Sequence, residues 1–205
     1  MKTLAQIVVL LTSIAFARAQ GAFEGLTDYS TGPSSGSFAV TAGWSFTPQI
    51  SIEVTHLGCL DYVVTPQGPV DVGLWTSAGQ LIASAIVDAT NKLTDVSRYV
   101  ALGTAVFLNA GTSYRLGVWS SSGLFLDPVG PGVGGSATVS SDIALGNAVV
   151  ASGNGFVFPD QQAGPAGTML LGPNFRFDRV PEPATGSLLF LGASLFLARR
   201  RLFKR

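Results

Sequence analysis

Residues 50–57 read Ile-Ser-Ile-Glu-Val-Thr-His-Leu, in which aliphatic and polar side chains alternate. The same alternation recurs in Val70–Leu74, directly before Trp75, and in Tyr114–Val118, directly before Trp119. A period of two places one set of side chains on a core face and the other toward solvent, which is typical of a strand in a half-buried sheet. These segments predict an all-β fold.

Other short segments of strand-like composition surround these three, and Gly, Pro, Asn and Ser separate them. They are Ser37–Phe46, Gln80–Val87, Arg98–Leu102, Ala105–Leu108, Ala137–Ile143, Ala148–Ala151, Gly155–Phe158 and Asn174–Phe177. Turn signals stand at 77–79 and 109–111. No stretch between residues 20 and 179 sustains the periodicity of a helix. We therefore expect one β-sandwich of about eight to eleven short strands over residues 20–179, jelly-roll-like in its connections.

Composition limits the chemistry of this domain. The 205 residues are 47% hydrophobic and only 12% charged, which argues against a disordered chain. A single Cys excludes an intramolecular disulfide, and a single His excludes sites with two or three His ligands. Between Gln20 and Val180 the net charge is −6, which argues against a nucleic-acid partner. We expect no cofactor and no bound metal.

Residues 1–19 have the three parts of a secretory signal peptide. Lys2 gives the positive start, Leu4–Phe16 is apolar, and Ala17-Arg18-Ala19 has the small residues of a cleavage site. The mature chain is then expected to begin at Gln20. The alternative is an N-terminal membrane anchor, but an apolar run of about 13 residues is short for a membrane span.

Residues 180–205 form a three-part tail. Val180, Pro181, Glu182 and Pro183 come first, 184–198 carry no charge, and Arg199, Arg200 and Arg201 follow. As a helix, the uncharged part is about 22 Å long, so the flanking arginines would have to snorkel. The basic end predicts a cytoplasmic C-terminus with the preceding domain outside the cell.

This tail resembles the PEP-CTERM sorting signal of Gram-negative bacteria, which has the same three parts in the same order. The resemblance implies export, a transient anchor in the inner membrane, and recognition by an exosortase, a membrane cysteine peptidase. Cleavage at or near 181–183 is then expected to send the domain to the cell surface or the exopolysaccharide matrix. Each Pro disfavours helix in the residue before it, so the motif is expected to be extended and accessible. The alternative is a plain C-terminal anchor.

A second resemblance covers most of residues 36–178. The runs Ile50–Gly58, Pro69–Ala85, Ala110–Tyr114 and Gly172–Phe177, with Tyr99-Val100, are similar to an uncharacterised β-sandwich domain of secreted bacterial proteins. Such domains often precede this kind of tail. The resemblance implies a fold and a setting, and it implies no activity.

Two glycine motifs match enzyme patterns by letter only. Residues 32–36 fit G-x-S-x-G, but a nucleophile elbow needs a strand before the Ser and a helix after it. Residues 130–135 fit G-x-G-x-x-G, but a strand-like run follows where a dinucleotide site needs a helix. We interpret both as loops.

Single polar residues leave other hypotheses open. His56 is expected to be a hydrogen-bonded structural residue, although a base or a single metal ligand remains an alternative. Cys59 is expected to be a buried free thiol, with an intermolecular disulfide as the alternative. Asp127, Asn154 and Asp160 lie in loop-like segments and would suit calcium, the less favoured hypothesis.

Trp75 and Trp119 each end an alternating segment out of phase with its aliphatic residues, so either ring is a candidate for stacking on a sugar. Core or rim packing is the competing interpretation. The leading hypothesis is a non-catalytic exported protein. The first alternative is a carbohydrate-binding module for exopolysaccharide, which predicts exposed aromatic rings on one face. The second is a matrix glycan hydrolase, which predicts two carboxylates about 5–10 Å apart across a cleft.

Overall fold

The computed structural model describes residues 23–30 and 36–180, and the described residues up to Arg179 belong to one compact unit, Gln20–Arg179. Its elements are β1 (Phe23–Glu24), β2 (Leu26–Ser30), β3 (Gly36–Phe38), β4 (Val40–Pro48), β5 (Ile52–Leu60), α2 (Asp61–Gln67), β6 (Val70–Thr76), β7 (Leu81–Val87), β8 (Leu93–Thr94), β9 (Ser97–Leu108), β10 (Tyr114–Trp119), β11 (Leu124–Leu126), β12 (Pro128–Val129), β13 (Ser136–Val139), β14 (Ile143–Asn154), β15 (Gln161–Gln162), β16 (Met169–Leu170) and β17 (Pro173–Arg179).

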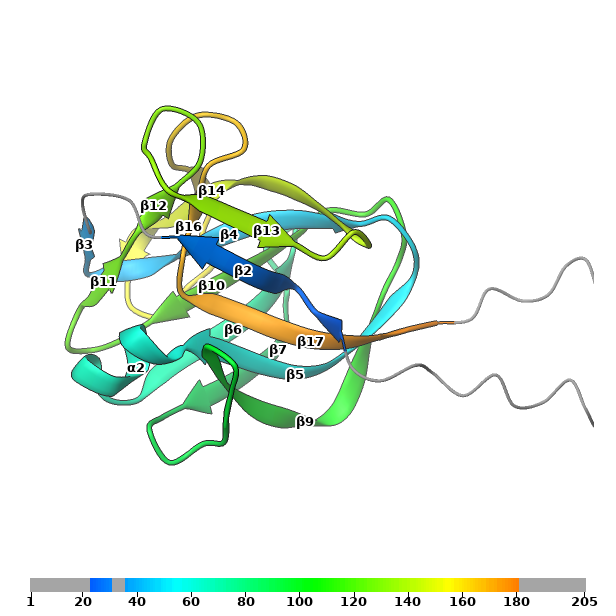
Figure 1. Cartoon of the computed structure of the whole chain (residues 1–205), viewed down its shortest axis with the longest axis horizontal. Coiled ribbons are helices and arrows are strands. Elements are labelled where there is room, and N and C mark those ends of the chain that lie inside the picture. The colour runs from blue at the N-terminus through cyan, green and yellow to red at the C-terminus, as the bar shows by residue number, and fades with distance from the viewer. Residues whose placement is uncertain (1–22, 31–35, 181–205) are drawn as a thin grey trace, which may run out of the picture. The chain divides into compact units, whose positions relative to one another are not determined.

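Two antiparallel sheets form the body of this unit. The five-stranded sheet has the order β1-β17-β5-β9-β8, and the six-stranded sheet has the order β15-β14-β4-β10-β6-β7. In Figure 1, β17, β5 and β9 cross the front while β4, β10 and β6 lie behind them. Three two-stranded ladders, β2 with β13, β3 with β11 and β12 with β16, complete the unit. This nearly all-β architecture is consistent with the expected sandwich.

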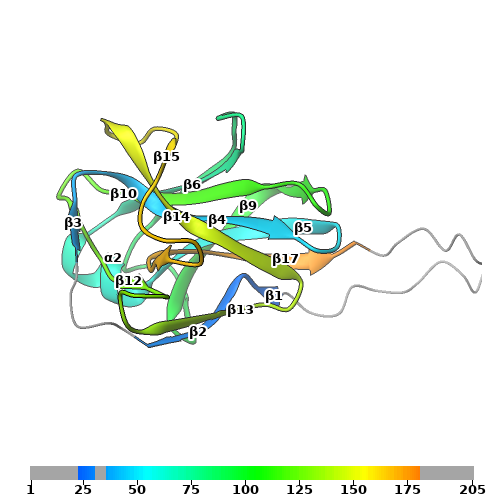
Figure 2. The ribbon, with the colours of Figure 1, turned by 90° about the horizontal axis from the view of Figure 1, so that it is seen from above.

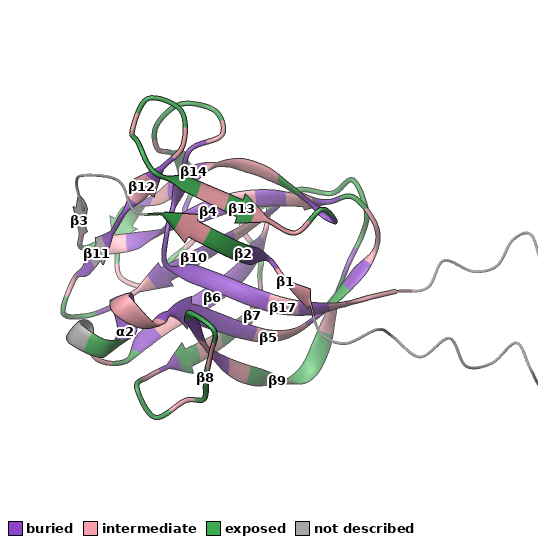
Figure 3. Cartoon of the chain, viewed as in Figure 1, coloured by how far each residue is buried: buried purple, intermediate pink, exposed green. Residues whose placement is uncertain are grey.

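Apolar side chains from both sheets meet in one core. Phe46 on β4 stacks against Phe175 on β17 with ring centroids 4.8 Å apart, and the Trp44 ring lies 5.9 Å from that of Phe175. The indole N–H of Trp44 donates to the carbonyl oxygen of Pro173 at 2.9 Å, so the two sheets share a polar contact as well. Figure 3 shows β5 and β17 buried along most of their length, whereas β2 and β13 carry exposed residues.

Most of the expected strands are confirmed, with different ends. The two segments expected at 98–102 and 105–108 are one strand, β9, whose pairing with β5 shifts register near His56. Both turns are confirmed: 77–79 joins β6 to β7, and 109–111 joins β9 to β10, with Gly79 and Gly111 at φ 91° and 73°. The prediction of a strand at Gly155–Phe158 is wrong, because that segment is irregular and crosses the outer face of the six-stranded sheet.

The helix α2 contradicts the expectation that residues 20–179 hold no helix. Its sequence, with Val63, Val64 and Thr65 in the middle, has low helix propensity. Tertiary contacts favour it, since Val63 and Val64 are fully buried and the Asp61 carboxylate accepts from Thr65 and Arg98. Gly68, at φ 80°, follows the last turn. A helix of seven residues is too short to give a clear periodic pattern.

Candidate functional site

Trp75 lies on the outer face of the six-stranded sheet, opposite to Leu74, which faces the core. Its ring lies against Gly73 and Gly117, which pair in register on neighbouring strands of the sheet. A Cβ on Gly73 would collide with the indole ring, and one on Gly117 would lie 3.3 Å from it. The missing side chains leave room for the ring against the sheet.

The segment 155–159 covers this ring from the solvent side. Phe156 packs against Trp75 with ring centroids 5.2 Å apart, and the guanidinium of Arg115 lies 4.8 Å over the Phe158 ring. Arg115 also donates to the carbonyl oxygen of Pro159. Figure 2 shows this connection and the β6–β7 turn at the same margin of the unit. Only 3% of Trp75 is exposed, which counts against this ring as a platform for a sugar.

Trp119 stands in a different setting on the same face. It is half-buried and pairs in register with Asp71, which in turn pairs with Ile86, 62% exposed. Across residues 23–30 and 36–180, no hydrogen bond or ion pair engages the Trp119 indole N–H or the Asp71 carboxylate. The row Trp119–Asp71–Ile86 thus combines an aromatic ring with a free donor and a free acceptor.

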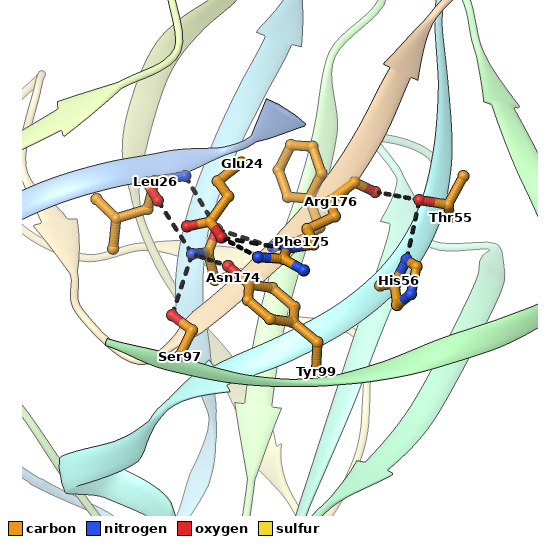
Figure 4. A network of polar contacts seen from close by, with 9 residues as sticks. All are labelled: Glu24, Leu26, Thr55, His56, Ser97, Tyr99, Asn174, Phe175 and Arg176. Atoms are coloured by element: carbon orange, nitrogen blue, oxygen red, sulfur yellow. Dashed lines mark hydrogen bonds and ion pairs between the residues drawn. The ribbon is translucent and has the colours of Figure 1, made fainter. Parts of the chain in front are cut away.

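A polar cluster lies on the outer face of the five-stranded sheet (Figure 4). We call Glu24, Tyr99, Asn174 and Arg176 the Arg176 cluster. The Nε and Nη2 groups of Arg176 donate to Oε1 of Glu24 at 3.1 and 2.7 Å, and the guanidinium lies 4.4 Å over the Tyr99 ring. The ring in turn lies over Gly58, where a Cβ would collide with it. An ion pair therefore covers this ring.

Asn174 is the most buried member of the Arg176 cluster, with no exposed surface. Its Oδ1 accepts from the backbone N–H groups of Leu26 and Phe175 at 2.9 and 2.8 Å. Its Nδ2 lies 2.7 Å from the Tyr99 hydroxyl, 3.1 Å from the Leu26 carbonyl oxygen and 3.2 Å from the Ser97 hydroxyl. These bonds link β2, β9 and β17, so Asn174 has a structural role.

His56 stands beside the Arg176 cluster on β5. Its Nδ1 lies 3.0 Å from the Thr55 hydroxyl, which donates to the carbonyl oxygen of Arg176 at 3.4 Å. Burial lowers the pKa of His56, and the positive charge of Arg176 lowers it further, against a smaller opposite effect of Asp178. The ring is therefore held toward its neutral form.

Cys59 is fully buried on β5, which confirms a free thiol in the described part of the chain. Burial raises the pKa of this thiol far above its usual range, so it stays protonated and unreactive. The placement also leaves no exposed sulfur for the alternative of an intermolecular disulfide.

The three calcium candidates lie in different settings. Asp127 is buried between β11 and β12, while Asn154 ends β14. The Asp160 carboxylate accepts from the Ser152 N–H and hydroxyl, both at 2.7 Å. Within 23–30 and 36–180, His, Cys, Asp and Glu form no group of three or more that could hold a metal ion.

The glycine motif at 130–135 is a loop between β12 and β13, as expected. Of the motif at 32–36, only Gly36 is described, at the start of β3. The signal cleavage residues Ala17, Ala19 and Gln20, the motif residues Pro181, Glu182 and Pro183, and the arginines 199–201 lie outside the described residues. None of the described helices is long and apolar enough to cross a membrane.

The described part of the chain ends one residue after Arg179, whose side chain makes several contacts. Arg179, the last residue of β17, donates through Nε and Nη2 to the two carboxylate oxygens of Asp142 at 2.6 and 3.1 Å. Its guanidinium also lies 4.3 Å over the ring of Phe23, which stacks on Phe177. We call Phe23, Asp142 and Arg179 the terminal clasp. Val180, the first residue of the predicted sorting motif, follows at once.

Sequence reasoning missed both the Arg176 cluster and the terminal clasp. Glu24 and Arg176 are 152 positions apart, and Asp142 and Arg179 are 37 apart. Only strand order and register bring them together, and neither is readable from one sequence. The alternation in β17 did place Arg176 outward, which was the available signal.

Comparisons with known proteins give no family. No family model matches the chain, and no curated protein matches it. Among solved structures, the infectious bursal disease virus VP2 subviral particle is a distant match at 12% identity and a TM-score of 0.26. The match covers 90% of this chain and 50% of the viral chain, and at that TM-score it carries no argument.

Proposed function

We propose that this chain is an exported, non-catalytic protein of the cell surface or extracellular matrix of a Gram-negative bacterium. Secretion machinery removes residues 1–19, and an exosortase removes the tail at or near Pro181–Pro183. The released product is the β domain, for which the sequence also predicts jelly-roll-like connections. The membrane is a partner only until the tail is cut.

One observation carries the proposal. Val180-Pro181-Glu182-Pro183 begins at the residue directly after β17, and the uncharged stretch and Arg199–Arg201 follow it. The two ends of the described domain support it as well. Phe23 on β1 pairs with Phe177 on β17. The first and last strands of the domain are therefore neighbours, and both lie between the two expected cleavage sites. Removal of 1–19 and of the residues after Pro183 would cost the fold no strand of either main sheet.

The non-catalytic part of the proposal rests on the state of the carboxylates. Glu24, Asp61 and Asp142 each form an ion pair with an arginine at 2.6 to 2.7 Å. The carboxylate oxygens that accept from these arginines are occupied and are not available to contact a sugar substrate. This favours a structural role over the hydrolase alternative.

Substitution in the sorting motif tests the proposal. Glu182→Ala in the native host should keep the protein in the membrane fraction with its tail attached, whereas the wild type should leave that fraction. Glu53→Ala, which removes an exposed carboxylate from β5 of the domain, is the matched control and should be sorted like the wild type. Equal release of Glu182→Ala and wild type would contradict sorting through this motif.

Glycan binding is a second candidate, favoured by the row Trp119–Asp71–Ile86. A half-buried indole beside an unengaged carboxylate offers stacking and hydrogen bonding at adjacent positions. Trp119→Ala should abolish retention of the soluble domain on exopolysaccharide from the same host. Phe107→Ala removes a more exposed ring from β9 of the other sheet and should leave retention unchanged. Unaltered retention of Trp119→Ala would exclude this surface.

A further inference from the structure

We propose that strand β7 is the edge through which two copies of this chain associate, pairing antiparallel with each other around a two-fold axis through Ser84. This inference goes beyond the proposed sorting and does not depend on it. The two six-stranded sheets would then form one continuous sheet across the pair of chains. In this kind of strand addition, main-chain hydrogen bonds supply affinity and side chains supply specificity.

β7 is a long sheet edge in a domain whose other sheet ends are short. Within residues 23–30 and 36–180, β7 pairs with β6 on one side and with no strand on the other. The other three ends of the two main sheets are β1, β8 and β15, which have two residues each, whereas β7 has seven. An edge strand presents unpaired N–H and C=O groups, and a short edge limits association through them. β7 lacks this protection.

The part of β9 that extends past β8 differs from β7 in its regularity. Its pairing with β5 is interrupted between Ala101 and Val106, and such irregularities hinder pairing at an edge. The pairing of β7 with β6 shifts only at Ile82, so Ala83–Val87 belong to a regular ladder. The regular open edge is therefore the centre of β7.

The composition of β7 also lacks the usual protections of an edge. Its sequence, Leu-Ile-Ala-Ser-Ala-Ile-Val, contains no charge, no Pro and no Gly. Ile86 is 62% exposed and Leu81 is 45% exposed. An uncovered apolar edge strand is a template for pairing with another chain. We therefore expect this edge to be covered in the native assembly.

The order of residues in β7 favours a second copy as the partner. Outward from Ser84, the strand has Ala on both sides, then Ile on both sides, then Leu on one side and Val on the other. In an antiparallel pair with Ser84 on the axis, each residue lies opposite one of its own kind. A two-fold interface uses the same patch on both chains and requires such self-complementarity. A shift of the axis by one residue in either direction would place Ser84 opposite an Ile.

The residues that flank β7 fit the same register. Gln80 and Asp88 are each four positions from Ser84, so Gln80 of one chain lies opposite Asp88 of the other at both ends of the pair. An amide donor opposite a carboxylate acceptor is complementary, whereas two acidic residues would repel each other. A two-fold pair leaves no β7 edge open, so association stops at two chains.

Cysteine cross-linking of the full-length chain in its native host tests the axis. Directly opposite Cα atoms of an antiparallel ladder lie about 4.5–5.5 Å apart, which is within the range of a disulfide. With copper phenanthroline and oxygen as the oxidant, two Ser84→Cys thiols lose two electrons and two protons and form one S–S bond. A reducible dimer of this chain is expected as the main species. Cys59 is fully buried and should not react.

Ser121→Cys is the matched control. Ser121 is an exposed serine in the turn after β10, and β6 separates β10 from β7. This variant should stay a single chain under the same oxidant. Equal cross-linking of the two variants would indicate chance collision and would overturn the axis. A reducible adduct of Ser84→Cys with a different protein would overturn the second copy as the partner.

Charge substitutions at the same position separate pairing from misfolding. Ser84 is exposed in the single chain, so Ser84→Lys and Ser84→Glu should both fold. Each places like charges opposite each other at the axis and should weaken the dimer by about tenfold or more. An equal mixture of the two variants brings opposite charges together and should restore the dimer in sedimentation equilibrium. Wild-type chains that sediment singly, or a mixture that does not restore the dimer, would overturn the proposal.

Discussion

Each main sheet buries one aromatic ring on its outer face, and the two rings are covered in different ways. Trp75 lies over Gly73 and is covered by Phe156 of the segment 155–159. Tyr99 lies over Gly58 and is covered by the guanidinium of Arg176. Both sheets use a glycine to admit a ring, but one cover is apolar and the other is charged. The stability of the first should depend on packing, and that of the second on ionic contacts.

The largest expected effect comes from removing the apolar-covered ring. Trp75→Ala should lower the free energy of unfolding by about 3–5 kcal/mol, because it leaves a cavity between the sheet and the segment 155–159. Urea titration followed by circular dichroism measures it. A loss of less than about 1 kcal/mol would mean that the segment 155–159 moves into the vacated space, and that burial of the Trp75 ring over the glycines adds little to stability.

Removing the charge from the second cover should cost less. Glu24→Gln should lower the free energy of unfolding by about 1.5–3 kcal/mol, because Arg176 loses a charged acceptor at a site where both side chains are about four-fifths buried. The same titration gives the value. Equal losses for Glu24→Gln and Trp75→Ala would show that the charged cover and the apolar cover contribute equally to the free energy of unfolding.

The Tyr99 hydroxyl offers a smaller and more local test. Tyr99→Phe keeps the ring over Gly58 and removes the 2.7 Å contact with Nδ2 of Asn174. Because Nδ2 keeps Leu26 and Ser97 as partners, the expected loss is about 1 kcal/mol. A loss equal to that of Trp75→Ala would show that the hydroxyl, rather than the ring, holds this cover.

The smallest effect concerns pH. Because the folded-state pKa of His56 is lowered below the unfolded value of 6.5, the unfolded chain binds a proton more readily. Its contribution is therefore fully present above about pH 6.5 and is lost as the pH falls through the folded pKa. His56→Gln should flatten the stability profile just below pH 6.5. An unchanged profile would show that burial and the charge of Arg176 do not lower the pKa of His56 in the folded chain.

The alternating segments predicted strands well because one face of each lies in a shared core. At β6 and β10 the aliphatic residues face inward as expected. The same pattern could not show that Trp75 is buried on the other face, since that depends on Gly73 of β6 and Gly117 of β10 lying side by side in register. The helix α2 escaped prediction because tertiary burial of Val63 and Val64 outweighs their low propensity.

The residues of the candidate site also differ in what local sequence pattern predicts and what only the strand topology reveals. Trp119 was identified from its phase in the strand, but its neighbour Asp71 became apparent only through register. The ion pairs of Arg176 and Arg179 join segments that lie far apart in the sequence, so neither could be predicted without the topology. The local sequence pattern predicted most of the strands, whereas strand pairing between distant segments determines which side chains lie next to one another on the surface.

Intact mass of the protein from its native host, measured separately on membrane and medium, tests the central claim most directly. The account predicts a species outside the membrane that begins at Gln20 and ends near Pro183. A chain that still carries Arg199–Arg201 and stays in the inner membrane would contradict it, and would show that the tail is a plain anchor.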